Sequence, residues 1–254
     1  MLVAICRAVS PSFAQCELTH IERVPIDVDR ARAQHRAYEE TLERLGVRVI
    51  SLPAEKDLPD SVFVEDTAVV LDEIAVMTRP GAASRRAEVQ TVAEALKAHR
   101  RLAFMQEPAT IDGGDVLRIG KTLYVGLSTR SDAAGIEALA NIVTPYGYAV
   151  RGVPLSGCLH LKSAATLIAP DVVLVNPAWV DPAVFEGTSN IPVHPEERHA
   201  ANALLIGDSV VYAAAYPRTC ERMMKFVKDI HCVDVSELAK AEGAVTCCSV
   251  VLEK

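Results

Sequence analysis

Residues 203–212 read ALLIGDSVVY, two short apolar runs on either side of Gly207-Asp208. Short apolar runs separated by a Gly-x pair are typical of a β-hairpin. A helix is expected to begin just beyond the hairpin, near Pro217. This stretch therefore predicts one unit made of a hairpin and a following helix.

The same unit recurs toward the amino terminus. A helix is expected to begin near Asp132, after the hairpin over 116–125, and another is expected over 84–99, after the hairpin over 62–77. The earlier paired runs are 165–168 with 172–175 around Pro170-Asp171, 116–119 with 122–125 around Gly120-Lys121, and 62–71 with 74–77 around an acidic turn. The remaining expected elements are a strand over 2–8, a helix from 27 to 45 ending at Gly46, a strand over 47–52 and a last strand over 245–252.

The hairpins begin near residues 62, 115, 164 and 203, and the first and last strands are expected to pair as a fifth unit. A repeat of about 40 to 50 residues indicates a propeller, solenoid or other cyclic array. A (β/α)₈ barrel would need eight strand–helix units without hairpins. The prediction is an α/β fold of five mixed units around a pseudo-axis, in one domain spanning 1–254 without a linker.

Composition excludes several classes of protein. Of the 254 residues, 50% are hydrophobic and the net charge is −7, which is the wrong balance for a nucleic-acid binder. Apolar runs fall short of the ~20 residues that a membrane helix needs. Seven scattered cysteines without a C-x-x-C pair indicate reduced thiols and a cytoplasmic protein rather than a disulfide framework or zinc site. No phosphate-binding loop is found, so nucleotide binding is not expected. The sequence leaves open whether the protein forms a homodimer.

Polar residues stand where the predicted hairpins begin, and cyclic repeats would bring these positions together at the axis. They are Asp60, Glu65 and Asp66 in the first unit, Asp112 and Asp115 in the second, His160 and Lys162 in the third, Asn202 in the fourth, and Cys247 with Cys248 in the fifth. A purely structural role is also open to these residues. Glu65 and Asp66 can pair with Arg85 or Arg86. Cys247 and Cys248 can be core residues, and His160 can be a hydrogen-bonded structural histidine.

A thiolate, an imidazole and several carboxylates around one cavity suit attack on a cationic carbon. Carboxylates match a planar guanidinium, which they bind through paired hydrogen bonds. The thiolate attacks the central carbon, and the histidine protonates the departing amine. The positive charge of the substrate also lowers the pKa of an adjacent thiol. Such chemistry requires no metal and no organic cofactor.

The sequence resembles the dimethylarginine dimethylaminohydrolases of the pentein superfamily. The likeness covers nearly the whole chain and is carried by LPDSVFVEDTAVV, TRPGAASRR, IDGGDVL, YVGLSTR, LHLKS, AAN and TCCSV, in that order. The resemblance implies a five-bladed αβ propeller formed by a single catalytic domain. It also implies hydrolysis of Nω-methylated L-arginine to L-citrulline and dimethylamine through a covalent S-alkylthiouronium, and a link to nitric oxide regulation.

The resemblance assigns roles residue by residue. Cys247 is the expected nucleophile, His160 the acid and then base, and Asp112 the carboxylate that orients His160. The expected substrate-binding residues are Glu65 and Asp66 at the guanidinium, Asp60 and the backbone of Leu18 at the α-amino group, Arg85 and Arg130 at the α-carboxylate, and the Ala241-Glu242 turn before the nucleophile.

The exact substrate stays open. The family usually has aspartate where this chain has Glu242, which leaves the preferred alkyl group undecided. Related enzymes act on arginine or hydroxyarginine, and a non-catalytic arginine-binding propeller is a further alternative. Residues 12–26 are interpreted as a lid over the site. Strand alternation would point Cys248 away from Cys247 into the core.

Overall fold

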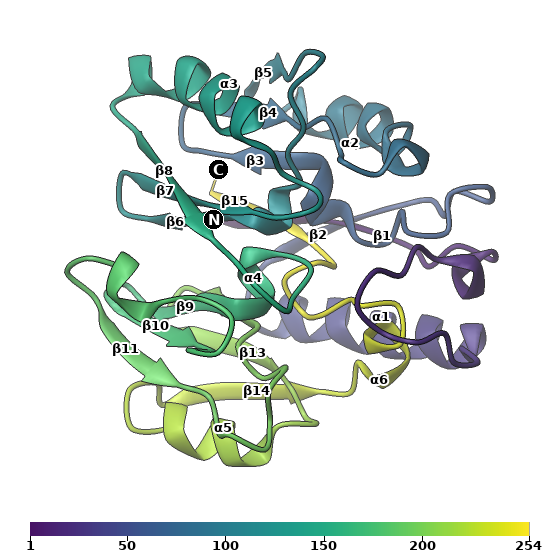
Figure 1. The fold of residues 1–254 in the computed structure, drawn as a ribbon. Helices are drawn as coiled ribbons and strands as arrows, with labels where there is room; N and C mark the ends of the chain where they lie inside the picture. The colour runs from purple at the N-terminus through teal and green to yellow at the C-terminus, as the bar shows by residue number, and fades with distance from the viewer. Residues whose placement is uncertain (254) are drawn as a thin grey trace.

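The computed structural model describes residues 1–253 and contains five three-stranded sheets arranged around a central axis (Figure 1). Residue 254, the last of the predicted domain, lies outside the described residues. The sheets are β15-β1-β2, β3-β4-β5, β6-β7-β8, β9-β10-β11 and β12-β13-β14. The fold is therefore the predicted five-bladed αβ propeller.

The strands are short and the helices lie between them in the chain. The strands are β1 Leu2–Arg7, β2 Arg48–Leu52, β3 Ala68–Val70, β4 Ile74–Met77, β5 Arg101–Phe104, β6 Val116–Ile119, β7 Thr122–Leu127, β8 Ala149–Pro154, β9 Ala165–Ala169, β10 Val172–Val175, β11 Ser189–Pro192, β12 Ala203–Ile206, β13 Ser209–Ala213, β14 Asp229–Val233 and β15 Val250–Glu253. The helices are α1 Val28–Arg44, α2 Glu88–Leu96, α3 Ala133–Val143, α4 Leu161–Ala164, α5 Pro217–Met223 and α6 Ser236–Ala239.

Every sheet has the same connectivity. Its first two strands pair antiparallel, and its middle strand pairs with the third strand in parallel. The fifth sheet is closed by the two ends of the chain, because Leu2 pairs with Glu253 and Ile5 with Val250. The N- and C-terminal ends therefore lie close together near the axis (Figure 1).

The first strands of the five sheets surround the axis. Strands β15 and β3, β6 and β9, and β9 and β12 contact one another across sheet boundaries. Together the five strands line an axial cavity, which also reaches Glu65, Gly113, Lys162 and Thr246. The segments that precede these inner strands are thus brought to one end of the axis.

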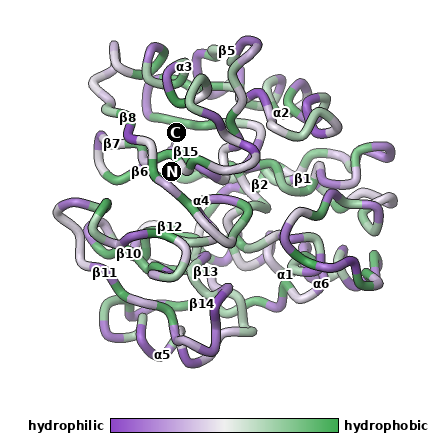
Figure 2. The backbone as a smooth tube through the Cα atoms, viewed as in Figure 1, coloured by the Kyte–Doolittle hydropathy of each residue, from purple (hydrophilic) through white to green (hydrophobic). Residues whose placement is uncertain are grey.

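The helices cover the outer faces of the sheets, as α1 illustrates. Its N-cap Asp27 accepts a hydrogen bond from the backbone of Arg30, and the helix is followed by Gly46 with φ +79°, a left-handed conformation that glycine adopts without strain. Tyr38 and Leu42 are fully buried on its inner face. Hydrophobic backbone segments gather along the strands, whereas hydrophilic ones mark the connecting loops (Figure 2).

Two predicted strands are wrong in part. Residues Val64–Thr67 form a 3₁₀ turn before β3, and residues 245–248 form a turn before β15. The two turns support one another, since the backbone N–H of Glu65 donates to the carbonyl of Cys247 at 3.2 Å. Their apolar residues pack between the turns rather than on the face of a sheet. Because these residues are buried, the sequence there is as apolar as that of a strand. The helix expected over 84–99 is shorter and runs from Glu88 to Leu96.

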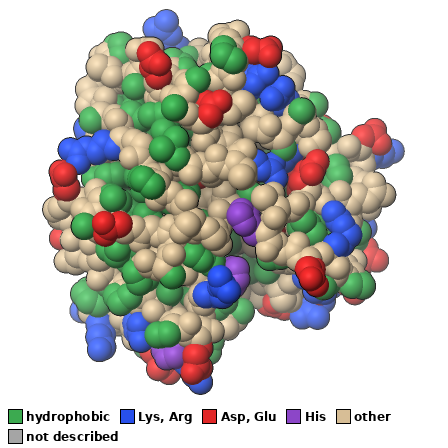
Figure 3. All heavy atoms as spheres, viewed as in Figure 1, with side chains coloured by type: hydrophobic (Ala, Val, Ile, Leu, Met, Phe, Trp, Pro, Cys, Tyr) green, Lys and Arg blue, Asp and Glu red, His purple; other side chains and the backbone are tan. Residues whose placement is uncertain are grey.

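The surface carries both signs of charge. On the face drawn in Figure 3, acidic and basic side chains are interspersed, with no field of a single sign. Among residues 1–253, none of the helices is both long enough and apolar enough to cross a membrane.

Candidate active site

A small cavity opens where the segments before the inner strands converge. His160 lies immediately before α4, and Cys247 lies in the turn before β15. The lining of this catalytic cavity contains most of the residues predicted from the sequence. These are Asp60, Asp66, Arg85, Arg130, His160, Ala241, Glu242 and Cys247, joined by Glu17, Phe63, Leu159 and Gly243.

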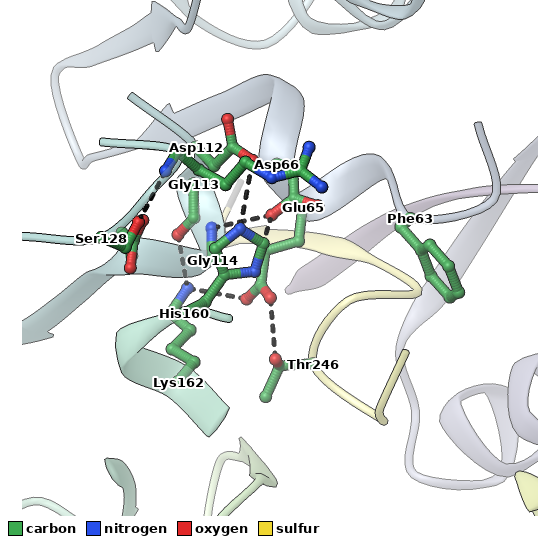
Figure 4. A network of polar contacts seen from close by, with 12 residues as sticks. Phe63, Glu65, Asp66, Asp112, Gly113, Gly114, Ser128, His160, Lys162 and Thr246 are labelled. Carbon is green, nitrogen blue, oxygen red and sulfur yellow. Dashed lines mark hydrogen bonds and ion pairs between the residues drawn. The ribbon is translucent and has the colours of Figure 1, made fainter. Parts of the chain in front are cut away.

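The imidazole of His160 is held between two carboxylates (Figure 4). Its Nε2 lies 3.1 Å from Oδ2 of Asp112, and its Nδ1 lies 3.8 Å from Oδ1 of Asp66. Burial alone would lower the pKa of His160, but Asp66, Asp112 and Asp115 outweigh it and raise that pKa to about 9. The histidine is therefore an imidazolium at neutral pH and carries the proton that a general acid needs.

Gly114 lets the imidazole approach the backbone. A Cβ on Gly114 would lie 2.7 Å from Nδ1 of His160 and 2.7 Å from Oδ1 of Asp66, closer than real Cβ atoms come. Its backbone N–H donates to that same Asp66 oxygen at 3.0 Å. Gly114 of the IDGGDVL motif thus creates space for the ring, whereas Gly113 allows a close approach to the backbone of Glu65, whose carbonyl oxygen a Cβ would meet at 2.0 Å.

Asp115 is a buried carboxylate that ties the histidine to its surroundings. It accepts hydrogen bonds from the hydroxyls of Ser128 and Ser131, at 2.6 and 2.7 Å, and from the backbone N–H of Leu161 at 2.9 Å. Burial raises its pKa to about 6. Its place at a predicted hairpin start marked Asp115 as polar but gave it no role. The structure shows that it fixes the chain directly after His160.

Cys247 is half-buried, and its turn is held from the neighbouring unit. The side chain of Asn202 accepts from the backbone N–H of Thr246 at 3.1 Å and donates to its hydroxyl at 2.9 Å. Burial, followed by the carboxylates of Glu65 and Asp66, raises the pKa of the Cys247 thiol well above its usual value. Cys248 is fully buried, as predicted, although it lies in a turn and not on an alternating strand.

Arg85 is buried and bound by protein groups. Its Nη1 donates to Oδ2 of Asp66 at 2.5 Å, and its Nη2 donates to Oε2 of Glu88 at 2.8 Å and to the carbonyl of Phe63 at 3.0 Å. The pairing of Asp66 with Arg85, which the sequence left as an alternative, is therefore present. Arg85 also lines the catalytic cavity, so pairing and substrate contact are compatible.

Arg130 stands at the edge of the cavity against the predicted lid. Its Nη2 donates to the hydroxyl of Thr19 at 3.1 Å. A Cβ on Gly81 would lie 2.4 Å from the carbonyl oxygen of Arg130, so only glycine fits there. Next to Thr19 in the chain, Leu18 is half-buried and packs against the hydrophobic core.

Glu65 lies in the lining of the axial cavity and not in that of the catalytic cavity. Its Oε1 accepts from Nζ of Lys162 at 2.7 Å, and its Oε2 accepts from the hydroxyl of Thr246 at 2.7 Å (Figure 4). The predicted contact of Glu65 with a guanidinium would therefore have to be made from outside the catalytic cavity, whereas Asp66 lines that cavity. The partner Lys162 stands out in the sequence only as a polar residue beside His160, without a role in the site.

Asp66, Asp112 and His160 place one potential metal-ligand atom each within 4.8 Å of one another. The same atoms make the contacts that keep the imidazole charged and oriented. The donor set is therefore explained by the proton chemistry of His160, and we assign it no metal.

Comparison with known proteins bears on this geometry. The family model described as "N,N dimethylarginine dimethylhydrolase, eukaryotic" matches residues 18–180. A dimethylarginine dimethylaminohydrolase of Streptomyces coelicolor is 42% identical over 253 residues, covering 99% of this chain and 97% of its own. The protein of the same name from Pseudomonas aeruginosa is 32% identical over 225 residues, covering 88% of this chain and 89% of its own.

Solved structures agree in fold. The Pseudomonas aeruginosa enzyme, as a cysteine-to-serine variant complexed with citrulline, superimposes with a TM-score of 0.94 at 30% identity and 98% coverage of both chains. The N-terminal domain of a cyanobacterial arginine dihydrolase superimposes with a TM-score of 0.85 at 17% identity, covering 99% of this chain and 98% of that one. That second likeness concerns the fold alone.

Proposed function

Because this chain belongs to the dimethylarginine dimethylaminohydrolase family, we propose that it hydrolyses Nω,Nω-dimethyl-L-arginine to L-citrulline and dimethylamine. The observation that carries the proposal is one cavity lined by a thiol, an imidazolium and a buried carboxylate, those of Cys247, His160 and Asp66.

The cavity offers charged groups of both signs to such a substrate. Asp60 and the carbonyl of Leu18 would receive the α-amino group, and Arg130 with Arg85 the α-carboxylate. Asp66, which pairs with Arg85 and faces the imidazole of His160, would receive the guanidinium. Because the cation enters a site rich in carboxylates, it gains charge-assisted hydrogen bonds that a neutral ligand would lack.

Substrate binding would generate the nucleophile. In the free protein, burial and two carboxylates raise the pKa of Cys247, so its thiol is protonated at neutral pH. A bound guanidinium cation supplies the opposite charge next to the sulfur, which favours the thiolate. The reactive form is then produced only when substrate is present.

The reaction balances with one water and no further reagent. The Cys247 sulfur bonds to the central guanidinium carbon, and the bond from that carbon to the dimethylated nitrogen breaks. His160 gives its proton to the departing amine, and Asp112 keeps the ring oriented. Neutral His160 then accepts a proton from water, whose oxygen attacks the S-alkylthiouronium carbon. The carbon–sulfur bond then breaks to release citrulline. The proton that the Cys247 thiol lost to solvent when the cation bound is returned to the sulfur, in balance with the proton that leaves the hydroxyl of the collapsing intermediate.

Replacement of the nucleophile tests the proposal. Purified protein should release citrulline from dimethylarginine without added cofactor, and Cys247→Ser should lower kcat at least about 10³-fold while substrate still binds. Cys232→Ser, which changes an exposed cysteine elsewhere, is the matched control. Turnover by Cys247→Ser within tenfold of the wild type would refute the mechanism.

A substrate panel separates the alternatives. Values of kcat/KM for dimethyl-, monomethyl-, hydroxy- and unmodified arginine identify the preferred derivative. Binding without product from any of them would instead favour a non-catalytic arginine-binding propeller. We also propose a cytoplasmic location, which the scattered and odd-numbered cysteines support.

A further inference from the structure

The predicted lid, residues 12–26, is attached to the rest of the protein by the side chain of Glu242. The backbone N–H of Thr19 donates to Oε2 of Glu242 at 2.6 Å, and that of His20 donates to Oε1 at 2.7 Å. Two consecutive amides of a loop are thus bound by the two oxygens of one carboxylate. A charged acceptor makes such hydrogen bonds stronger than neutral ones.

These bonds fix the position of Leu18. On its amino-terminal side, the N–H of Glu17 donates to Oδ2 of Asp60 at 3.1 Å. On its carboxyl-terminal side, Thr19 is held by Glu242. The Leu18 carbonyl, which the proposed function assigns to the substrate α-amino group, is therefore anchored from both directions.

The backbone at Glu242 indicates that this arrangement is specific. Glu242 has φ +58° and is the only non-glycine residue among 1–253 with a left-handed backbone. Long side chains adopt that conformation at an energetic cost, and such residues cluster where function demands them. The following Gly243 packs tightly, since a Cβ there would lie 2.2 Å from the ring of Phe63. The turn consequently has little freedom to relax.

Glu242 also stands between two cavities. It lines the catalytic cavity together with Cys247, and it lines a larger neighbouring cavity together with His20 and Ile21 of the lid. Release of the two lid amides would therefore open the catalytic cavity on the side where the lid covers it.

We propose that Glu242 is a positioning residue that latches the lid and thereby sets the substrate's amino-acid end in place. Glu242 acts through Leu18 and Thr19. This assignment differs from the direct substrate contact that the resemblance implied for the Ala241-Glu242 turn. The kinetic part of the inference rests on the proposed function, but the latch itself does not.

Amide exchange tests the latch without any turnover. In Glu242→Ala, the amides of Thr19 and His20 should exchange at least about tenfold faster, because their acceptor is gone. Alkylation of Cys247 by iodoacetamide at fixed pH should also accelerate. Glu242→Gly should behave in the same way, and since glycine accepts the positive φ, it keeps the test valid if the alanine variant folds poorly.

Kinetics test the positioning role. Both variants should raise KM about tenfold while kcat stays within about threefold. Glu242→Gln, which retains one acceptor oxygen, should recover part of the protection and part of the KM, whereas Glu242→Asp tests whether one methylene of reach is needed. Glu22→Ala, an exposed acid of the same lid, should leave all readouts unchanged.

Unchanged exchange at Thr19 and His20 in the alanine and glycine variants would overturn the latch. A fall in kcat at constant KM would overturn the positioning role. If the wild type released no citrulline, the proposed function would fail, yet the exchange and alkylation results would still decide the latch.

Discussion

Glu65 and Asp66 are neighbours in one 3₁₀ turn, yet they belong to two cavities that share no lining residue. Asp66 meets Arg85, Gly114 and His160, where charge can respond to a bound cation. Glu65 meets Lys162 and Thr246 on the axial side. Because the turn has helical geometry, consecutive side chains diverge.

The carboxylates of Asp66 and Glu65 differ in which groups they pair with. Burial would raise the pKa of Asp66, but His160 and then Arg85 outweigh burial and lower that pKa, so the carboxylate stays ionised where the imidazolium needs a counter-charge. Glu65 joins Lys162 of the third unit to Thr246 of the fifth, and so ties together the chain segments that carry His160 and Cys247. Under the proposed function, the two adjacent acids would therefore contribute to one reaction in different ways.

The largest expected effect is on catalysis at Asp66. Asp66→Asn removes the charge facing His160 and the guanidinium, and it should lower kcat/KM about 10³-fold. Glu65→Gln should lower kcat/KM by about tenfold or less, because its carboxylate lies outside the catalytic cavity. Steady-state citrulline release measures both. Equal losses in the two variants would show that the two acids act together.

The next effect is a pH dependence of stability on the catalytic side. The pKa of His160 is raised from 6.5 to about 9, so its contribution is fully present below pH 6.5 and is lost as the pH rises through 9. The free energy of unfolding should fall by about 3 kcal/mol over that interval through this group. Urea titrations at stepped pH measure the slope, and His160→Asn should remove it. A slope that survives this substitution would assign the dependence to other groups.

The smallest expected effect is on the stability of the axial side. Glu65→Gln leaves Lys162 partly buried without its counter-ion and should cost about 2 kcal/mol of unfolding free energy. Adding Lys162→Met should restore part of that loss, since the unpaired charge is removed as well. Denaturant unfolding of both single variants and the double variant completes the cycle. Additive losses would mean that the pair is not coupled.

The hairpins were predictable because their signals are local. Gly207-Asp208 and Pro170-Asp171 mark turns between apolar runs, and the structure has strands on both sides of each. The third strand of four sheets was missed. Strands such as β5 and β14 are short, lie at sheet edges and expose about half of their residues, so they show little periodicity.

The site was predictable as a set of residue types but not as a network. Cys247, His160 and Asp66 stand out as polar groups at hairpin starts, and the structure brings them to one cavity. Their partners depend on long-range contacts. Lys162 and Glu65 are 97 residues apart, and Glu242 reaches Thr19 across 223 residues. No local pattern encodes such pairings, because they exist only once the ring has closed.

Ring closure by β1 and β15 has a consequence for biosynthesis. Strand β15, which completes this sheet, follows the other described strands in the chain, and the turn that carries Cys247 directly precedes it. A nascent chain that lacks β15 cannot bring its thiol to the imidazole of the third unit. The protein should therefore acquire its reactive centre only after β15 has been synthesised and has paired with β1, so that chains still short of β15 carry no active thiol.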